Sequence, residues 1–105
     1  MPYRIEIYIG SDNNTKRISK NYSNKVKSWA SEVFPEGYTL IKGKGFYNGV
    51  SEDSVIISVF SDQERKLNRE LYCLKQKLKQ DSVLVVKYFV ISRCYDEVCI
   101  LWSKD

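Results

Sequence analysis

Residues 34–60, FPEGYTLIKGKGFYNGVSEDSVIISVF, decide the fold of this chain. They have the composition of two strands joined by a polar turn. The second strand is residues 55–60 (VIISVF), an apolar run rich in β-branched residues. The residues between the strands, Tyr47-Asn48-Gly49 and Ser51-Glu52-Asp53, favour a turn because asparagine and glycine tolerate positive φ angles. We therefore predict a β-hairpin here.

A strand and a helix are predicted before this hairpin. Residues 3–9 alternate strictly between apolar and polar positions, with Tyr3, Ile5, Ile7 and Ile9 on one face. Residues 18–33 carry an apolar stripe at helical spacing, made of Tyr22, Val26, Trp29, Ala30 and Val33. Pro35 ends the helix, because the residue before a proline avoids the helical region.

After the hairpin we predict a second helix and two strands. Ser61-Asp62-Gln63-Glu64 matches a capping box, and a leucine stripe follows at Leu67, Leu71, Leu74 and Leu78. Residues 82–92 and 98–102 are apolar on both parities, which is typical of strands covered on both faces. Two helices cover only one face of such a sheet, so a second copy of the chain is expected on the other.

The order strand, helix, strand, strand, helix, strand predicts the fold class. It is the α+β, ferredoxin-like β-α-β-β-α-β arrangement, here with an added C-terminal fifth strand. The right-handed crossover rule puts both helices on one face of an antiparallel sheet. The strand at residues 3–9 is expected inside the sheet, and the final strand at an edge beside residues 82–92. The 105 residues form a single predicted domain, 1–105.

Three segments also resemble a known family: YRIEIY at residues 3–8, FPEGYT at 34–39 and QDSVLVV at 80–86. They are similar to an uncharacterised family of small bacterial and archaeal ferredoxin-like domains of unknown function. The resemblance implies the same topology and brings no activity with it. This chain departs from the family pattern by continuing past the fourth strand into residues 96–102.

Composition points to a cytoplasmic protein. With 43% hydrophobic residues the chain can bury a core, and its net charge of +4 neither demands nor excludes an anionic partner. The first residues lack the pattern of a signal peptide, and no apolar run is long enough to span a bilayer. Cys73, Cys94 and Cys99 lack metal-ligand spacing, although Cys94 and Cys99 could face each other across a hairpin.

We do not expect an enzyme. The chain has no histidine, which is the usual general base near neutral pH. Glu52 and Asp53 are expected in the turn, and none of the cysteines lies at an activating helix amino terminus. We predict no catalytic residue, no metal site and no cofactor.

Candidate binding residues fall in two groups. Lys42-Gly43-Lys44-Gly45 places two glycines on one face of a strand, flanked by lysines that suit a small anionic ligand. A bent strand explains the glycines as well. Tyr8 and Tyr88 could offer stacking rings on the open sheet face. The basic residues around the first helix, Lys16, Arg17, Lys20, Lys25 and Lys27, form either a solvated face or an anion-contacting surface.

These features favour a non-enzymatic binding or regulatory module. It is expected to self-associate through its sheet, as a homo-dimer or higher oligomer, and to hold a small anionic, nucleotide-like ligand or a protein partner. The expected interface residues are Phe89, Val98, Ile100 and Trp102. One alternative is a phage-type inhibitor or sponge acting on a host defence or signalling factor. Another is a single-stranded nucleic-acid-binding domain, favoured by Lys44-Gly45-Phe46, which echoes the start of an RNA-recognition strand signature.

Overall fold

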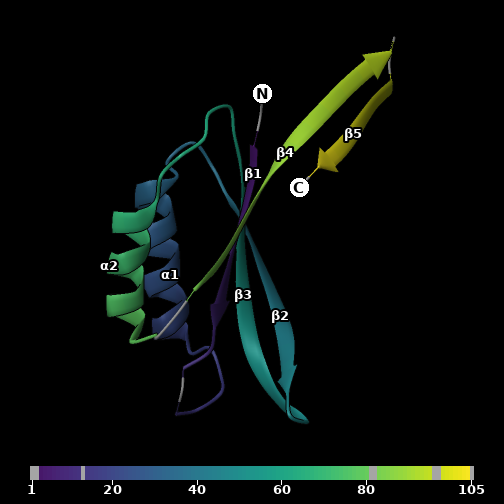
Figure 1. Cartoon of the computed structure of the whole chain (residues 1–105). Helices are drawn as coiled ribbons and strands as arrows, with labels where there is room; N and C mark the ends of the chain where they lie inside the picture. Colours follow the sequence, from purple (N-terminus) through teal and green to yellow (C-terminus); the bar gives the residue numbers. More distant parts are fainter. Residues whose placement is uncertain (1–2, 13, 81–82, 96–97, 105) are drawn as a thin grey trace.

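Five antiparallel strands and two helices make up the fold (Figure 1). The computed structural model describes residues 3–12, 14–80, 83–95 and 98–104, with side chains as far as Tyr88. In chain order the elements are β1 (Tyr3–Gly10), α1 (Lys20–Val33), β2 (Thr39–Tyr47), β3 (Val50–Ser61), α2 (Asn68–Leu78), β4 (Leu84–Tyr95) and β5 (Val98–Lys104). The sheet order is β2-β3-β1-β4-β5. The ferredoxin-like arrangement with an added edge strand is therefore confirmed.

The central strand β1 carries much of the core. Ile5, Ile7 and Ile9 are at most 1% exposed, and they alternate with residues on the opposite face. Figure 1 shows α1 and α2 side by side on one side of the sheet. The isoleucines therefore face the helices, while the residues between them lie on a face that no helix of the described chain covers.

Helix α1 begins at Lys20, two residues later than the predicted range, and ends at Val33 as predicted. The Ser19 hydroxyl accepts a hydrogen bond of 3.1 Å from the Tyr22 amide, which satisfies one of the free donors of the first turn. The helix ends at Val33, two residues before Pro35. Most of the predicted stripe is buried, and the Trp29 indole donates to the Glu70 carbonyl at 2.8 Å, which ties α1 to α2.

The β2–β3 hairpin has a tighter turn than the sequence suggests. Asn48 and Gly49 form it alone, with φ angles of 51° and 80°. Positive φ at both positions matches the right-handed twist of the flanking strands. Glu52 and Asp53 were expected in the turn, but they lie in β3, in register with Gly45 and Lys44. The prediction was wrong because a two-residue loop leaves these acids to extend the ladder.

The predicted capping box at residues 61–64 is also wrong. Ser61 is the last residue of β3, and its hydroxyl bonds to the backbone of Gln63. Helix α2 begins only at Asn68, after Leu67, which is 1% exposed and anchors the helix start in the core. Burial of this leucine outweighs the local cap. The leucine stripe is confirmed at Leu67, Leu74 and Leu78, and Leu71 is partly buried against the same core.

The last two strands form an edge hairpin. β5 pairs with β4 as predicted, and its register places Cys94 opposite Cys99. In Figure 1 this hairpin extends beyond the helices. The side chains of Phe89, Val98, Ile100 and Trp102 lie outside the described residues, so self-association through them stays a prediction. None of the described helices is long and apolar enough to cross a membrane.

Candidate functional site

A row of three side chains crosses the uncovered sheet face at one end of the molecule. The strand register pairs Arg4 of β1 with Phe60 of β3 on one side and with Tyr88 of β4 on the other. The Arg4 guanidinium lies 5.6 Å from the centre of the Phe60 ring, within cation–π range. Phe60 is nevertheless 59% exposed, so much of the residue remains open to solvent.

Glu6 adds a partly buried carboxylate to this row. The Tyr88 hydroxyl donates to it at 2.7 Å, and Arg4 lies 4.0 Å away. Only 16% of the Glu6 side chain is exposed. Partial burial raises the pKa of the Tyr88 hydroxyl, and its bond to the Glu6 carboxylate acts in the same direction. Within the described chain the buried Nε of Arg4 has no hydrogen-bond partner. We call Arg4, Glu6, Phe60 and Tyr88 the sheet-face row.

Next to the row lies a cavity with a volume of about 530 Å³. We call it the end groove, and its lining is Val33, Phe34, Pro35, Glu36, Gly37, Val59, Phe60, Ser61, Asp62, Gln63 and Arg65. Phe60 belongs to both the row and the groove. The volume falls within the range of about 300–1,000 Å³ that small-molecule sites occupy.

The floor of the end groove is packed into the hydrophobic core. Phe34 is 3% exposed and meets the Trp29 ring edge-on, with centroids 5.9 Å apart. The Arg65 guanidinium lies 5.0 Å from the Phe34 ring centre and donates to the Val33 carbonyl at 2.8 Å. Glu36 and Asp62 contribute carboxylates to the lining. The groove therefore combines the exposed Phe60 ring with acidic groups, which suits a ligand that is partly aromatic and partly cationic.

The predicted binding residues divide between this end of the sheet and the hairpin. Tyr88 belongs to the sheet-face row. Tyr8 lies on the same face, in register with Ile56, and is 36% exposed. Lys42 and Gly43 line a separate hollow of about 350 Å³, together with Ile18, Lys44, Asp53 and Ser54.

In that hollow one of the two lysines is already engaged. Lys44 contacts the Asp53 carboxylate at 2.6 Å, and this contact, with a second one from the Ile18 amide, lowers the pKa of Asp53. A Cβ atom on Gly45 would meet the Tyr47 ring at 2.9 Å, so the close approach at this glycine comes from the chain's own side chain. No finding tests a ligand role for Lys42, Gly43, Lys44 and Gly45, which stays a prediction.

Sequence reasoning missed Arg4, Glu6 and Phe60. Their alternation was visible, and it placed Arg4 and Glu6 on the wet side of a strand. What it lacked was the strand register, which brings Phe60 and Tyr88 to Arg4 across two different strand pairs. Among the described residues no three His, Cys, Asp or Glu side chains gather as metal ligands would.

Two solved structures of a phage SAM lyase are similar to this chain. The apo enzyme matches with a TM-score of 0.57 and 18% identity, over 97% of this chain and 87% of that one. The enzyme in complex with S-methyl-5′-thioadenosine matches with a TM-score of 0.56 and 17% identity, over 98% and 88%. No family model and no curated protein matches the chain. The resemblance to an uncharacterised family therefore stays a prediction.

This similarity corrects two expectations, that the chain is not an enzyme and that it is a binding or regulatory module. A non-enzymatic module was predicted, chiefly from the absence of histidine, yet the matched structures are of an enzyme with this fold over nearly the whole chain. The inference failed because a missing general base excludes only those reactions that need one. At this level of identity the likeness shows the fold, which is ferredoxin-like in its order of strands and helices.

Proposed function

We propose that this chain is a phage-type enzyme that cleaves S-adenosylmethionine (SAM), with the end groove and the sheet-face row as its substrate site. The observation that carries the proposal is the fold match to phage SAM lyase over 97% of the chain. The chemistry of the site supports it, because SAM combines an adenine ring, a sulfonium cation and an amino-acid group. The proposed function is therefore the turnover of a nucleotide-like metabolite, and not its binding alone.

The reaction breaks the bond between the sulfonium sulfur and the γ-carbon of the amino-acid chain. The bonding electron pair goes to sulfur, which leaves as the neutral thioether of S-methyl-5′-thioadenosine. In the same step the four-carbon fragment either loses a proton to a base or closes on its own carboxylate. A chain without histidine favours ring closure, which needs no protein base. Such a step consumes one positive and one negative charge, so a site with little water accelerates it.

The residues of the site have separable roles in this proposal. The end groove, with the Phe34 ring packed beneath it, takes the adenosine. The exposed Phe60 ring faces the sulfonium, since an aromatic face attracts a cation without hydrating it. The Glu6 carboxylate takes the substrate ammonium group, and Tyr88 is a positioning residue that orients this carboxylate through its 2.7 Å hydrogen bond.

The test is to incubate the purified protein with SAM and to measure S-methyl-5′-thioadenosine by chromatography and mass spectrometry. Wild type should release it. In Glu6→Gln the KM should rise by about 10- to 100-fold, the equivalent of losing a hydrogen bond to a charged group worth about 1.5–3 kcal/mol. Tyr88→Phe should move KM in the same direction by less, because the carboxylate remains.

The matched control is Glu32→Gln, which removes the same charge from an exposed position on α1 and should leave KM unchanged. Folded wild-type protein that releases no S-methyl-5′-thioadenosine would overturn the proposed function. Turnover that Glu6→Gln leaves intact would keep the function and place the substrate elsewhere.

A further inference from the structure

The opposite end of the molecule carries a second cavity with a different lining. The β1–α1 loop, the first turns of α1 and the last turn of α2 meet there around a hollow of about 280 Å³. It is lined by Asp12, Asn14, Tyr22, Lys25, Lys77, Leu78 and Lys79. We call this cavity the lysine hollow. It shares no residue with the end groove.

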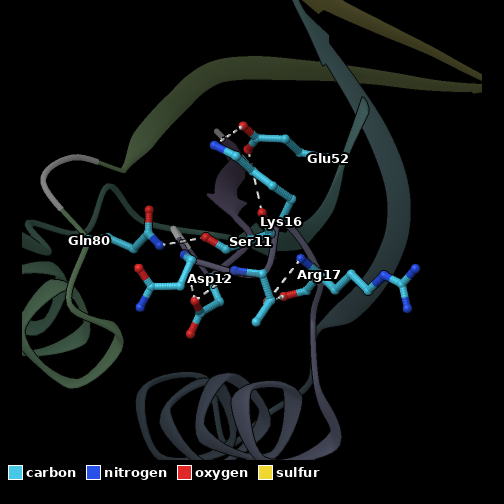
Figure 2. A network of polar contacts seen from close by, with 8 residues as sticks. Ser11, Asp12, Lys16, Arg17, Glu52 and Gln80 are labelled. Carbon is cyan, nitrogen blue, oxygen red and sulfur yellow. Dashed lines mark hydrogen bonds and ion pairs between the residues drawn. The ribbon is translucent and has the colours of Figure 1, made fainter. Parts of the chain in front are cut away.

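Hydrogen bonds of the loop hold the wall of the lysine hollow in place (Figure 2). Gln80, just after α2, donates to the Ser11 carbonyl at 2.7 Å and so ties the loop to the helix end. The Asp12 carboxylate accepts from the amides of Asn14 at 2.8 Å and Thr15 at 3.3 Å. The Asp12 carboxylate, the one acidic group in this lining, therefore already accepts two backbone hydrogen bonds.

Two lysines of the hollow, Lys25 and Lys77, form no ion pair among the described residues. Lys25 and Lys77 are exposed, and the ion pairs of the described residues, which are Arg4–Glu6, Lys16–Glu52 and Lys44–Asp53, include neither. Two carbonyls at the end of α2, those of Gln76 and Lys75, already accept hydrogen bonds from the amides of Lys79 and Gln80. The ammonium groups of Lys25 and Lys77 are therefore available to an anion from outside.

We propose that the lysine hollow binds the phosphate backbone of single-stranded nucleic acid. Lysines from two helices converge on a cavity, and compact ammonium charges suit phosphates, which bind them as point charges. The aromatic residue of the lining, Tyr22, is 6% exposed and offers no face for a base to stack on. The contact therefore reads the backbone alone, and its affinity is independent of sequence and steeply dependent on salt.

Binding is measured by fluorescence anisotropy with a labelled 16-nucleotide DNA strand of mixed sequence, between 50 and 200 mM salt. The test variant is Lys25→Gln with Lys77→Gln. Its affinity at 50 mM salt should be about 10-fold lower than that of wild type. Its slope of log K against log salt should be shallower by about 1.4, since each phosphate contact on a single strand contributes about 0.7.

The control is Lys66→Gln with Arg69→Gln, which removes the same charge from two exposed positions at the other end of α2, Lys66 just before the helix and Arg69 in its first turn. It should bind as wild type does. The proposal is overturned if wild type does not bind at 50 mM salt, if both double variants weaken equally, or if polyglutamate competes as well as the DNA does, which would indicate an acidic protein partner. The SAM assay separates this hypothesis from the proposed function, because both double variants should cleave SAM normally if the enzyme is active.

Discussion

The two ends of this molecule are built by different means. The end groove has an aromatic floor in the hydrophobic core, with Phe34 packed between Trp29 and the Arg65 guanidinium. The lysine hollow also meets the core, at Tyr22 and Leu78, but its Asp12 and Asn14 side is a loop held by hydrogen bonds to backbone atoms. A ring packed in the core keeps its place as long as the protein is folded, whereas a loop wall depends on a few polar contacts. The difference indicates shape-selective recognition at the groove and recognition of charge at the hollow.

The largest effect is expected from breaking the groove floor. Phe34→Ala should lower the free energy of unfolding by about 3–5 kcal/mol, because it removes a buried ring and leaves a cavity. Urea unfolding followed by circular dichroism measures it. Phe34→Leu, a milder truncation, should stay folded and lose SAM cleavage while binding DNA as wild type does. Equal losses of both activities in Phe34→Leu would show that the two ends are not independent.

A smaller effect is expected from a change at Tyr22, which lines the lysine hollow. The Tyr22 hydroxyl donates to the Gly10 carbonyl at 2.5 Å and joins α1 to the end of β1. Tyr22→Phe leaves that carbonyl without its donor and should lower the free energy of unfolding by about 1–3 kcal/mol at pH 7. Its SAM cleavage at low temperature should remain that of wild type.

Tyr22 also predicts a pH dependence of stability. Burial raises the pKa of Tyr22 from 10.0 to about 12, so the folded state keeps a proton that the unfolded state gives up. This contribution to stability is fully present below pH 10 and is lost as the pH rises through 12. Between pH 9 and 12 the free energy of unfolding, measured in urea at each pH, should fall more steeply with pH for wild type than for Tyr22→Phe. An equal fall in both proteins would contradict the assignment.

The smallest effect concerns one ring at the mouth of the groove. Phe60→Ala should lower kcat/KM for SAM by about 10-fold, or roughly 1.4 kcal/mol, by removing the face offered to the sulfonium. Stability should change little, because the ring is 59% exposed. Phe46→Ala is the matched control, since this phenylalanine is 71% exposed on β2, near the hairpin turn. If both variants lose activity alike, the sulfonium does not bind at the groove.

The fold was predictable from sequence where local pattern and burial agree. The alternation of β1 and the stripe of α1 each have one dominant period, and the structure follows both. The start of α2 was not predictable, because burial of Leu67 overrides a good local cap at Ser61. The site was predicted only at Tyr88. Arg4, Phe60 and Tyr88 meet through strand register, and a single sequence does not contain that information.

The alternation of β1 and β3 also bears on how such a protein can change over generations. Ile5 and Ile7 face the core, and Arg4 and Glu6 lie between them on the other face. Val59 and Phe60 divide in the same way on β3. Substitutions at Arg4, Glu6 and Phe60 can therefore accumulate without repacking the interior. One scaffold can in this way explore new ligands while selection for folding acts on the neighbouring positions.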